Sequence, residues 1–424
     1  MPKLAIVDKQ TSRRPVSHPP FHLWSCQQRS GSAKIDAKLI PLTGVAPLPK
    51  ACNTALVAHI DCAGGGQVWV DGTTLYCAHM KAPHGTTIYD VADPKKPRQI
   101  ADIEIPHGWH SHKVRVANGV MIVNHEKLGP DGDAAFGGGL GIYDVSKPAA
   151  PKLITKWKVS AGRGVHRYDF DGRYAYISPT VEGYEGNIAM TLDLRDPAKP
   201  AEVGRWWIPG QWKAGGETYE RNLGVTPRCH HPMRLGNRLY VSYWHHGYFI
   251  LDCSDMTKLE LVKAVNHSPL FGHPTHTCLP IPQPLKGRQV MIVADEDVAK
   301  LRPCPPSFTW IYDITDETQP TPISTFQVPG LDTDGSPQPA MTGCHQPSER
   351  FSGTIVPFAW FANGLRIVDI ADPFAPREIG SYLPDPAPGA ERVSSNDVTI
   401  DDRGLIYLVD RIGGIDIIES KAVG

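Results

Sequence analysis

The chain has 424 residues, of which 41% are hydrophobic and 21% charged, and its 43 basic and 44 acidic residues leave a formal charge of −1. This composition is typical of a soluble globular protein and excludes a fibrous or disordered chain. A charge so close to zero gives no general attraction to nucleic acid or to an anionic membrane, so neither is expected as a partner.

The N-terminal segment MPKLAIVDKQTSRRPVSHPP lacks the apolar stretch of a secretory signal, and no window of about 18 apolar residues occurs in the chain. Nine cysteines are scattered without a CxxC pair. This pattern is typical of reduced, mostly buried thiols rather than of a disulfide framework. The sequence therefore predicts a cytoplasmic protein.

One sequence unit recurs along the chain. Its copies are IYDVADPKKP (88–97), IYDVSKPAAP (142–151), TLDLRDPAKP (191–200), ILDCSDMTKL (250–259), IYDITDETQP (311–320) and IVDIADPFAP (367–376), and a truncated seventh copy, IDIIES (415–420), ends the chain. Successive copies begin 48 to 61 residues apart. This spacing is close to the roughly 40–50 residues of a propeller blade, with loop insertions added.

Each unit is predicted to be the outer half of a blade. An apolar triplet ending in Asp forms one strand, a proline-containing turn follows, and a second strand returns. Upstream of the units lie paired alternating runs across short glycine-containing turns, such as HKVRVANGVMIV (112–123), which are predicted to be the inner strands. The sequence therefore predicts an all-β fold, a seven-bladed β-propeller with four-stranded antiparallel blades.

The truncated seventh copy lacks its outer strand. The segment TALVAHID (54–61) is expected to supply it, so that an N-terminal strand pairs with the C-terminal blade and closes the ring. The predicted propeller spans residues 54–424. Residues 1–53 do not match the repeat and are expected to form an N-terminal arm or extension.

The recurring pattern [IL]-x-D-[VI]-x-[DS]-x-x-x-P resembles the LVIVD-repeat β-propeller family over about residues 54–420. The resemblance implies the propeller fold. It implies little about chemistry, because propellers carry many different functions.

Histidine recurs at the start of the predicted innermost strands. When the blades are aligned on the turn between their first two strands, the aligned position holds His112, His166, His231, His276 and His345 in five blades, and Gly66 and Asn396 in the other two. Innermost strands line the axis of a propeller, so these side chains are expected to converge. Five neutral imidazoles need a partner for their lone pairs, and a divalent metal ion provides one. We therefore predict that these five histidines hold a metal ion; the alternative is a water-filled polar channel.

Loops that follow the second strand of each blade are expected to cover the same site. Glu126, Glu182 and Glu296 follow their strands most directly, and they are the candidate general acids or bases, or the partners that orient ring histidines. The alternative is that they are solvated loop charges. Residues that precede aligned positions are expected to contact the metal ligands or a substrate; they are His110, His230, His273 and Cys344.

A ligand set made of histidine excludes calcium and magnesium, and it leaves iron, copper, zinc, nickel or manganese. The arrangement is similar in architecture to the carotenoid cleavage oxygenases, which hold iron with four histidines on a propeller axis. It is also similar to the selenium-binding protein and methanethiol oxidase family, whose His-x-x-His-Cys-Leu segment PTHTCLP (274–280) resembles. These resemblances imply an iron or copper oxidase or oxygenase that acts on a small organic molecule.

Two other functions stay open. One is a metal-dependent hydrolase or lyase, with zinc or manganese, in which Glu126 or Glu182 moves protons. The other is a non-catalytic propeller scaffold, although a large partner could not reach polar residues on the axis. The expected partner is a small-molecule substrate, and homo-oligomerisation is left open. The sequence holds no GxxxxGK[ST] loop, GxSxG elbow or HExxH helix.

Overall fold

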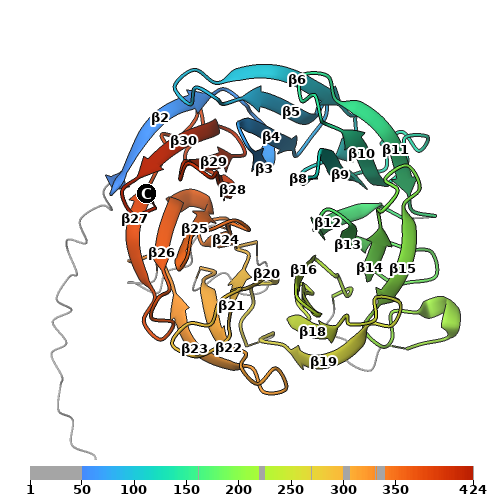
Figure 1. Cartoon of the computed structure of the whole chain (residues 1–424). Helices are drawn as coiled ribbons and strands as arrows, with labels where there is room; N and C mark the ends of the chain where they lie inside the picture. Colours follow the sequence, from blue (N-terminus) through green and yellow to red (C-terminus); the bar gives the residue numbers. More distant parts are fainter. Residues whose placement is uncertain are drawn as a thin grey trace, which may run out of the picture. The chain divides into compact units, whose positions relative to one another are not determined.

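Seven antiparallel sheets, each built on four strands, lie around a common axis and form a ring (Figure 1). The computed structural model describes residues 50–160, 162–218, 225–268, 270–298, 306–329, 331 and 340–423. This architecture confirms the all-β, seven-bladed β-propeller that the repeats predict. Of the predicted arm at 1–53, residues 1–49 lie outside the described residues.

The strands of each blade follow one another from the axis outward. Blade 1 has β3 (Gly65–Asp71), β4 (Thr74–His79), β5 (His84–Asp90) and β6 (Arg98–Glu104). Blade 2 has β7 (Trp109–His110) and β8 (Val114–Ala117), both paired with β9 (Val120–Lys127), then β10 (Gly139–Asp144) and β11 (Lys152–Lys158). Blade 3 has β12 (Val165–Phe170), β13 (Tyr174–Pro179), β14 (Ala189–Asp193) and β15 (Ala201–Trp206). Blade 4 has β16 (His231–Leu235), β17 (Arg238–Ser242), β18 (Tyr248–Asp252) and β19 (Glu260–Val265).

The remaining blades have the same order. Blade 5 has β20 (Thr275–Pro280), β21 (Val290–Asp295), β22 (Thr309–Asp313) and β23 (Thr321–Phe326). Blade 6 has β24 (Cys344–Pro347), β25 (Ile355–Trp360), β26 (Gly364–Asp369), β27 (Arg377–Tyr382) and β1 (Ala51–Cys52). Blade 7 has β28 (Ser395–Ile400), β29 (Ile406–Asp410), β30 (Gly414–Ser420) and β2 (Thr54–Ile60). Two short 3₁₀ helices, η1 (Lys213–Gly215) and η2 (Phe361–Asn363), complete the described chain, in which no helix is long and apolar enough to cross a membrane.

The aspartate of the repeat ends the third strand in six blades. In blade 2, for example, Asp144 is the last residue of β10, and its Oδ1 accepts a hydrogen bond from the backbone N–H of Ser146 at 2.9 Å. The same bond, two residues along the chain, recurs in the other five blades at 2.7–3.0 Å. A carboxylate that accepts from the backbone two residues on stabilises a turn and competes with strand continuation. The repeat is therefore a turn motif that separates the third and fourth strands.

The two ends of the described chain meet in blade 7. Strand β2 pairs antiparallel with β30, from Thr54 opposite Ser420 to Ile60 opposite Ile415, and the first and last colours of the chain lie side by side in Figure 1. Strand β1, which the repeats do not predict, pairs with the outer strand β27 of blade 6. Hydrogen bonds between distant parts of the chain therefore hold the last blade to the ring.

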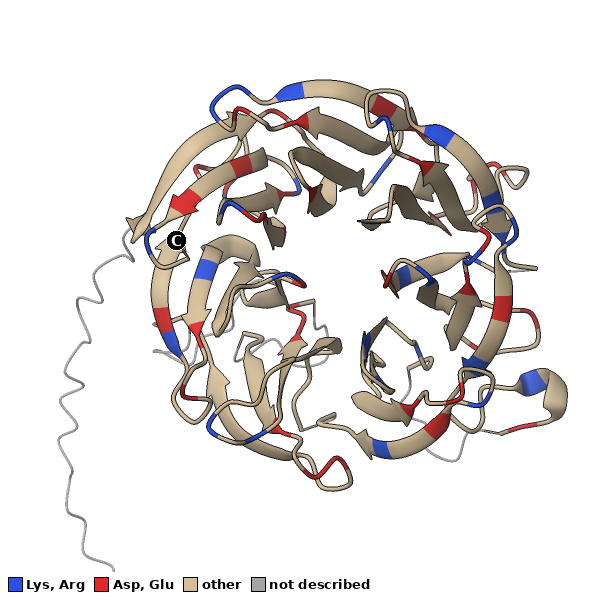
Figure 2. Cartoon of the chain, viewed as in Figure 1, with Lys and Arg blue, Asp and Glu red and all other residues tan. Residues whose placement is uncertain are grey.

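The apolar core lies between neighbouring blades, in seven separate clusters. Between blades 2 and 3, for example, Ile122 and Ile142 pack with Tyr168 and Ile177, and all four are buried. Lys, Arg, Asp and Glu of both signs are distributed around the outer strands and turns (Figure 2). Because the apolar faces of neighbouring blades pack against one another, the residues at the start of each innermost strand are the ones that line the axis.

Candidate metal centre

A closed circle of residues, which we call the histidine ring, surrounds the axis at the start of the innermost strands. Its members in ring order are Gly66, His112, His166, His230, His276, His345 and Asn396. The centroids of neighbouring imidazoles lie 4.3–4.8 Å apart. Asn396 closes the circle, because its backbone oxygen accepts from Nδ1 of His345 and its amide donates to the oxygen of Gly66. A Cβ on Gly66 would lie 2.8 Å from that of His112, so glycine alone fits there.

Blade 4 contributes His230 to the ring, and His231 lies outside it. In blade 3 the N–H of Arg167, which follows His166, donates to a serine hydroxyl of β13 at 2.8 Å. In blade 4 the N–H of His231 makes the equivalent bond to a serine hydroxyl of β17 at 3.0 Å. His231 therefore occupies the position of Arg167, and aligning the blades on their turns is wrong by one residue in blade 4.

The residues that directly follow the ring members form a second polar layer along the axis, which we call the axial floor. They are Gln67, Lys113, Arg167, His231, Thr277, Gln346 and Asp397. Gln346 accepts from Arg167 at 2.7 Å and donates to Asp397 at 2.6 Å. Glu349 forms ion pairs with Lys113 and Arg115, and it lies 3.5 Å from both Arg167 and His231. This network closes the axis on one side of the ring.

On the other side of the ring lies a cavity of about 270 Å³. The five ring imidazoles and Asn396 line it, together with Arg228, Arg411, Glu296 and Trp244. The ring is thus accessible to a small molecule from one side only.

The ring imidazoles are neutral. Burial is the largest cause that lowers their pKa values, and neighbouring imidazoles and arginines lower them further. The pKa lies well below its ordinary value for every ring histidine except His345, for which it is also lowered. Each imidazole therefore carries one N–H and one nitrogen lone pair, and its partners decide which nitrogen is which.

The facing nitrogens of His166 and His230 both carry lone pairs. Nδ1 of His166 lies 2.5 Å from Oε2 of Glu126, and Nδ1 of His230 lies 2.9 Å from the backbone oxygen of His276. Both partners only accept, so each Nδ1 carries the proton and each Nε2 is unprotonated. The two Nε2 atoms nevertheless lie 3.1 Å apart. Two facing lone pairs repel unless a proton or a cation lies between them, and the lowered pKa values disfavour the proton.

In His276 and His345, too, Nε2 is the unprotonated nitrogen. Nδ1 of His345 donates to the backbone oxygen of Asn396, and Nδ1 of His276 bonds to the Thr277 hydroxyl at 2.7 Å. Nε2 of His276 lies 3.3 Å from a guanidinium nitrogen, which only donates. Four ring histidines therefore have unprotonated Nε2 atoms.

Glu296 supplies a carboxylate next to two of these nitrogens. Its oxygens lie 3.4 Å from Nε2 of His345 and 3.9 Å from Nε2 of His276. Burial would raise the pKa of Glu296, but His345, Arg411 and Arg228 outweigh burial and hold the pKa below its ordinary value. An ionised carboxylate beside unprotonated nitrogens is a further arrangement that a cation would stabilise.

His112 has the opposite tautomer. The side-chain amide of Asn124 has a fixed orientation, because its oxygen accepts from the N–H of Lys113 at 2.8 Å and its nitrogen donates to the oxygen of Val165 at 3.0 Å. That nitrogen also lies 3.2 Å from Nδ1 of His112. Nδ1 is therefore the acceptor, and Nε2 carries the proton. His112 is better placed to donate a hydrogen bond than to bind a metal.

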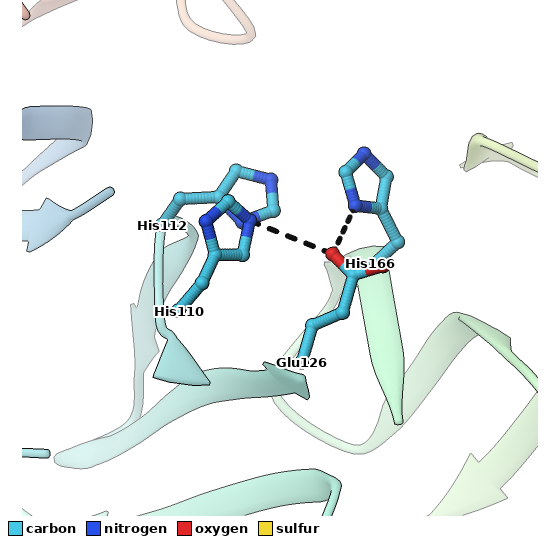
Figure 3. Close-up of side chains that lie close together, drawn as sticks. All are labelled: His110, His112, Glu126 and His166. Carbon is cyan, nitrogen blue, oxygen red and sulfur yellow. Dashed lines mark hydrogen bonds and ion pairs between the residues drawn. The ribbon is translucent and has the colours of Figure 1, made fainter. Parts of the chain in front are cut away.

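Glu126 holds the blade 2 and blade 3 side of the ring together. Figure 3 shows His110 and His112 on one side and His166 on the other, with the Glu126 carboxylate between His110 and His166. Nε2 of His110 lies 3.5 Å from Oε2 of Glu126, while the other carboxylate oxygen pairs with Arg163 at 3.1 Å. Glu126 is buried, and it orients His166 as a carboxylate commonly orients a metal-ligating imidazole.

The other predicted site residues lie apart from the ring. Glu182 is exposed on the loop between β13 and β14, and it does not line the cavity. Nδ1 of His273 lies 3.5 Å from Asp297. Cys344 belongs to the apolar core between blades 5 and 6, and burial raises its pKa. Arg228 and Arg411 line the cavity, and of these only Arg411 directly follows the second strand of a blade, where covering loops are expected.

The donor set fits a transition-metal ion. His230, His276 and Glu296 bring one ligand atom each to within 4.8 Å of one another, as do His110, His112, Glu126 and His166. The 3.1 Å between Nε2 of His166 and of His230 suits two nitrogens that bind one ion at about 2.0–2.1 Å. Neutral imidazole nitrogen suits zinc, copper, iron and nickel.

Comparisons with known proteins bear on the fold. LVIVD repeats are identified at residues 134–159, 235–267 and 358–384. No curated protein matches the chain. The periplasmic gluconolactonase PpgL of Pseudomonas aeruginosa is similar in structure, with a TM-score of 0.52 and 12% identity over 76% of this chain and 86% of that chain. Sqt1 of Saccharomyces cerevisiae has a TM-score of 0.49 and 9% identity over 86% of this chain and 88% of that chain.

At 12% identity the likeness to the gluconolactonase concerns the fold alone and does not extend to activity. The resemblance to histidine-ligated metal propellers stays a prediction. The repeats and the ring of seven sheets agree with each other, since three identified repeats coincide with the turns after β10, β18 and β26. The protein is therefore a seven-bladed β-propeller that carries LVIVD repeats.

Proposed function

We propose that the protein is a metal-dependent enzyme whose histidine ring holds a divalent transition-metal ion, and that its substrate is a small molecule bound in the axial cavity. The observation that carries this proposal is the pair of unprotonated Nε2 atoms of His166 and His230, which face each other at 3.1 Å. Nothing else in the described chain lies between them to compensate two lone pairs.

Each residue of the site has a separate task in this proposal. His166, His230 and His276 are the ligands, with His345 next to them, and the ion would supply Lewis acidity or electron transfer. Glu126 fixes the tautomer and orientation of His166. His112 can donate from Nε2 to a bound molecule, and the axial floor excludes water from the opposite side of the ring.

An oxidoreductase that uses iron or copper is the first candidate. Imidazole ligands suit both metals. Glu126 is held by His166 and Arg163, so it is not free to exchange a proton with substrate. The site thus offers metal ligands and few free acid or base groups, which favours chemistry performed by the metal ion itself.

A hydrolase or lyase that uses zinc or manganese is the second candidate, and Glu296 favours it. Its carboxylate lines the cavity and is ionised, so an Oε atom could accept a proton from a water molecule or from a substrate. Glu182, the other glutamate expected to act in this way, is too far out on its loop.

The test is the metal content of the purified full-length protein, measured by elemental analysis, in wild type and in two neighbouring variants. We expect about one iron or copper ion per chain in wild type and in His231→Gln, and loss of metal in His230→Gln, because only His230 faces the ring. His166→Ala is also expected to lose metal. Zinc or manganese instead would favour the hydrolase or lyase, and dioxygen uptake would separate the two classes.

A protein that retains no metal after reconstitution with each ion would contradict the proposal and leave the scaffold function. Equal metal content in His230→Gln and wild type would contradict the ligand assignment. His231→Gln is the matched control, since it removes the same side chain one residue away and leaves the ring intact.

A further inference from the structure

Arg228 lines the axial cavity with donors that the described residues leave unused. Its Nε is buried and has no hydrogen-bond partner among the described residues. The guanidinium carbon lies 4.9 Å from the centre of the Trp244 ring, so one face of the group is covered by an aromatic side chain. This stacking leaves the edge of the guanidinium, where the N–H donors lie, for another group.

Arg411 has a similar environment at the end of β29. Its guanidinium carbon lies 5.2 Å from the Phe361 ring, and its Nε donates to the side-chain oxygen of Asn396 at 2.6 Å. Within the described ranges, no carboxylate lies within ion-pair distance of Arg228 or Arg411. Two cations in a confined cavity are therefore not neutralised by direct contact.

Neither carboxylate near the two arginines makes a direct ion pair with them. Glu126 pairs with Arg163 and His166. Glu296 acts on Arg228 and Arg411 only from beyond ion-pair distance, so two cations face one ionised carboxylate in the cavity. The third arginine of the cavity, Arg167, is held by the axial floor through Gln346 and Glu349. A neutral ligand would leave Arg228 and Arg411 partly desolvated without compensation, which is costly, whereas an anion would pair with them.

We infer that the axial cavity binds small organic carboxylates, with the carboxylate group on Arg228 and with Arg411 adding positive charge. A guanidinium edge matches the two oxygens of a carboxylate, which favours this group over a spherical anion. Trp244, Val298 and Met80 also line the cavity and provide an apolar wall for the rest of the molecule. The volume of about 270 Å³ lies below the roughly 300–1,000 Å³ of sites for drug-sized ligands, so the ligand is small.

This inference names the substrate class of the proposed metal centre, and to that extent it rests on the proposed function. The binding step itself does not need the metal, because the arginines are part of the protein chain. The experiment therefore uses the full-length protein both as purified and after chelation, so that direct binding of a carboxylate to metal can be separated from binding to Arg228.

The test compares carboxylates with amides of the same shape, by calorimetric titration with benzoate and benzamide and with propionate and propionamide. We expect the carboxylates to bind roughly tenfold or more tightly than the amides, since a hydrogen bond between two charged groups is stronger than one from a charged group to a neutral acceptor. We expect Arg228→Gln to remove this preference and Arg411→Gln to reduce it. Arg205→Gln, which removes an arginine of the outer strand β15, is the matched control and is expected to keep the preference.

Equal affinity for carboxylate and amide in the wild-type protein would overturn the inference, whether or not the variants fold. An unchanged preference in Arg228→Gln would also overturn it. If the protein never retains metal but still prefers carboxylates, the anion site is supported and only the metal centre is contradicted. If the protein retains metal but shows no preference, the metal centre is supported and only the anion site is contradicted.

Discussion

At the scale of single residues, fixed hydrogen-bond acceptors decide the chemistry of the ring. A carboxylate and two backbone oxygens hold the proton on Nδ1 of His166, His230 and His345, so their Nε2 atoms are free. The amide of Asn124 reverses this for His112. Five histidines at equivalent positions are therefore not equivalent ligands, because each imidazole has a different neighbour at its Nδ1.

Cys62 is expected to be the most reactive of the buried thiols. It lies between β2 and β3, and its sulfur, that of Cys77 and a ring nitrogen of His79 lie within 4.8 Å of one another. A hydrogen bond from Cys77 is the largest cause that lowers the pKa of Cys62, burial opposes it, and His79 lowers it further, to about 5. Burial raises the pKa of Cys229, Cys278 and Cys344.

We therefore predict that iodoacetamide at about pH 6 alkylates Cys62 before those three cysteines, because the thiolate is the nucleophile. Peptide mapping by mass spectrometry measures the rate at each site. Cys77→Ala removes the main donor and is expected to shift the pH dependence of the reaction toward the ordinary thiol range of about 8.5. A rate at Cys62 no greater than at Cys278 would contradict this prediction.

The residue type at the ring could be predicted from sequence, but not the register of every blade. Aligning on the turns finds the ring positions in six blades, and in blade 4 it takes His231 for its neighbour His230, because two histidines are adjacent there. The better signal is the second strand. Lys113, Arg167 and His231 are each 11 residues before the side chain that accepts their N–H, so the hydrogen-bonding side chain of the second strand marks the ring position in all three blades.

At the scale of strands, the repeat predicts where the third strand of a blade ends, because its aspartate accepts a hydrogen bond from the backbone nearby in the sequence. A bond between a side chain and the backbone two residues away depends on sequence alone. Strand β1 has no such signal, since its pairing with β27 depends on where a distant segment passes. The turns were therefore predictable from a local motif, and the pairing of β1 with β27 was not.

Strand β2 is expected to be needed for stability. Six residue pairs join it to β30, and a net contribution of about 1 kcal/mol per hydrogen bond gives on the order of 5 kcal/mol for the strand. This is comparable with the whole stability of many domains, about 5–15 kcal/mol. A variant that begins at Asp61 is thus expected to unfold at much lower denaturant concentration than one that begins at Ala51.

Circular dichroism during urea unfolding of the two truncated variants measures the difference. Both variants lack residues 1–50, so the comparison isolates the segment that contains β1 and β2. The exposed edge of β30 is also expected to promote association of the shorter variant. Equal midpoints for the two variants would show that the ring does not depend on this strand.

At the scale of the whole molecule, the axial floor joins four blades through one carboxylate. Glu349 follows β24 of blade 6 and contacts Lys113 and Arg115 of blade 2, Arg167 of blade 3 and His231 of blade 4. Burial would raise the pKa of Glu349, but Arg115, Lys113 and Arg167 lower it to about 2. The sequence did not indicate this layer, because glutamate within a loop carries no sign of its partners.

The pKa of Glu349 is lower in the folded chain than in the unfolded chain, where it is about 4.3, so its ionised carboxylate stabilises the fold at pH values above about 4.3. This contribution is lost as the pH falls toward 2. Two pKa units correspond to about 3 kcal/mol. Glu349→Gln leaves buried cations without their partner, so we predict a loss of about 3–5 kcal/mol in the free energy of unfolding at pH 7. We also predict that the stability of the variant falls less steeply than that of wild type between about pH 4 and 2.

Urea unfolding of the wild-type and variant proteins across this pH range tests both statements. Glu378→Gln is a suitable control, because Glu378 pairs with Arg366 away from the axis. Parallel pH profiles for wild type and Glu349→Gln would show that the carboxylate does not stabilise the axis through its charge.

The histidine ring brings together residues that are up to 330 positions apart in the sequence. The proposed function depends on a cation inside this ring. The most direct measurement is anomalous X-ray diffraction from crystals of the metal-loaded protein, at the absorption edge of the metal that elemental analysis identifies. The account predicts a peak within about 2.0–2.1 Å of Nε2 of both His166 and His230. A map without a peak inside the histidine ring, from a protein shown to contain metal, would contradict it.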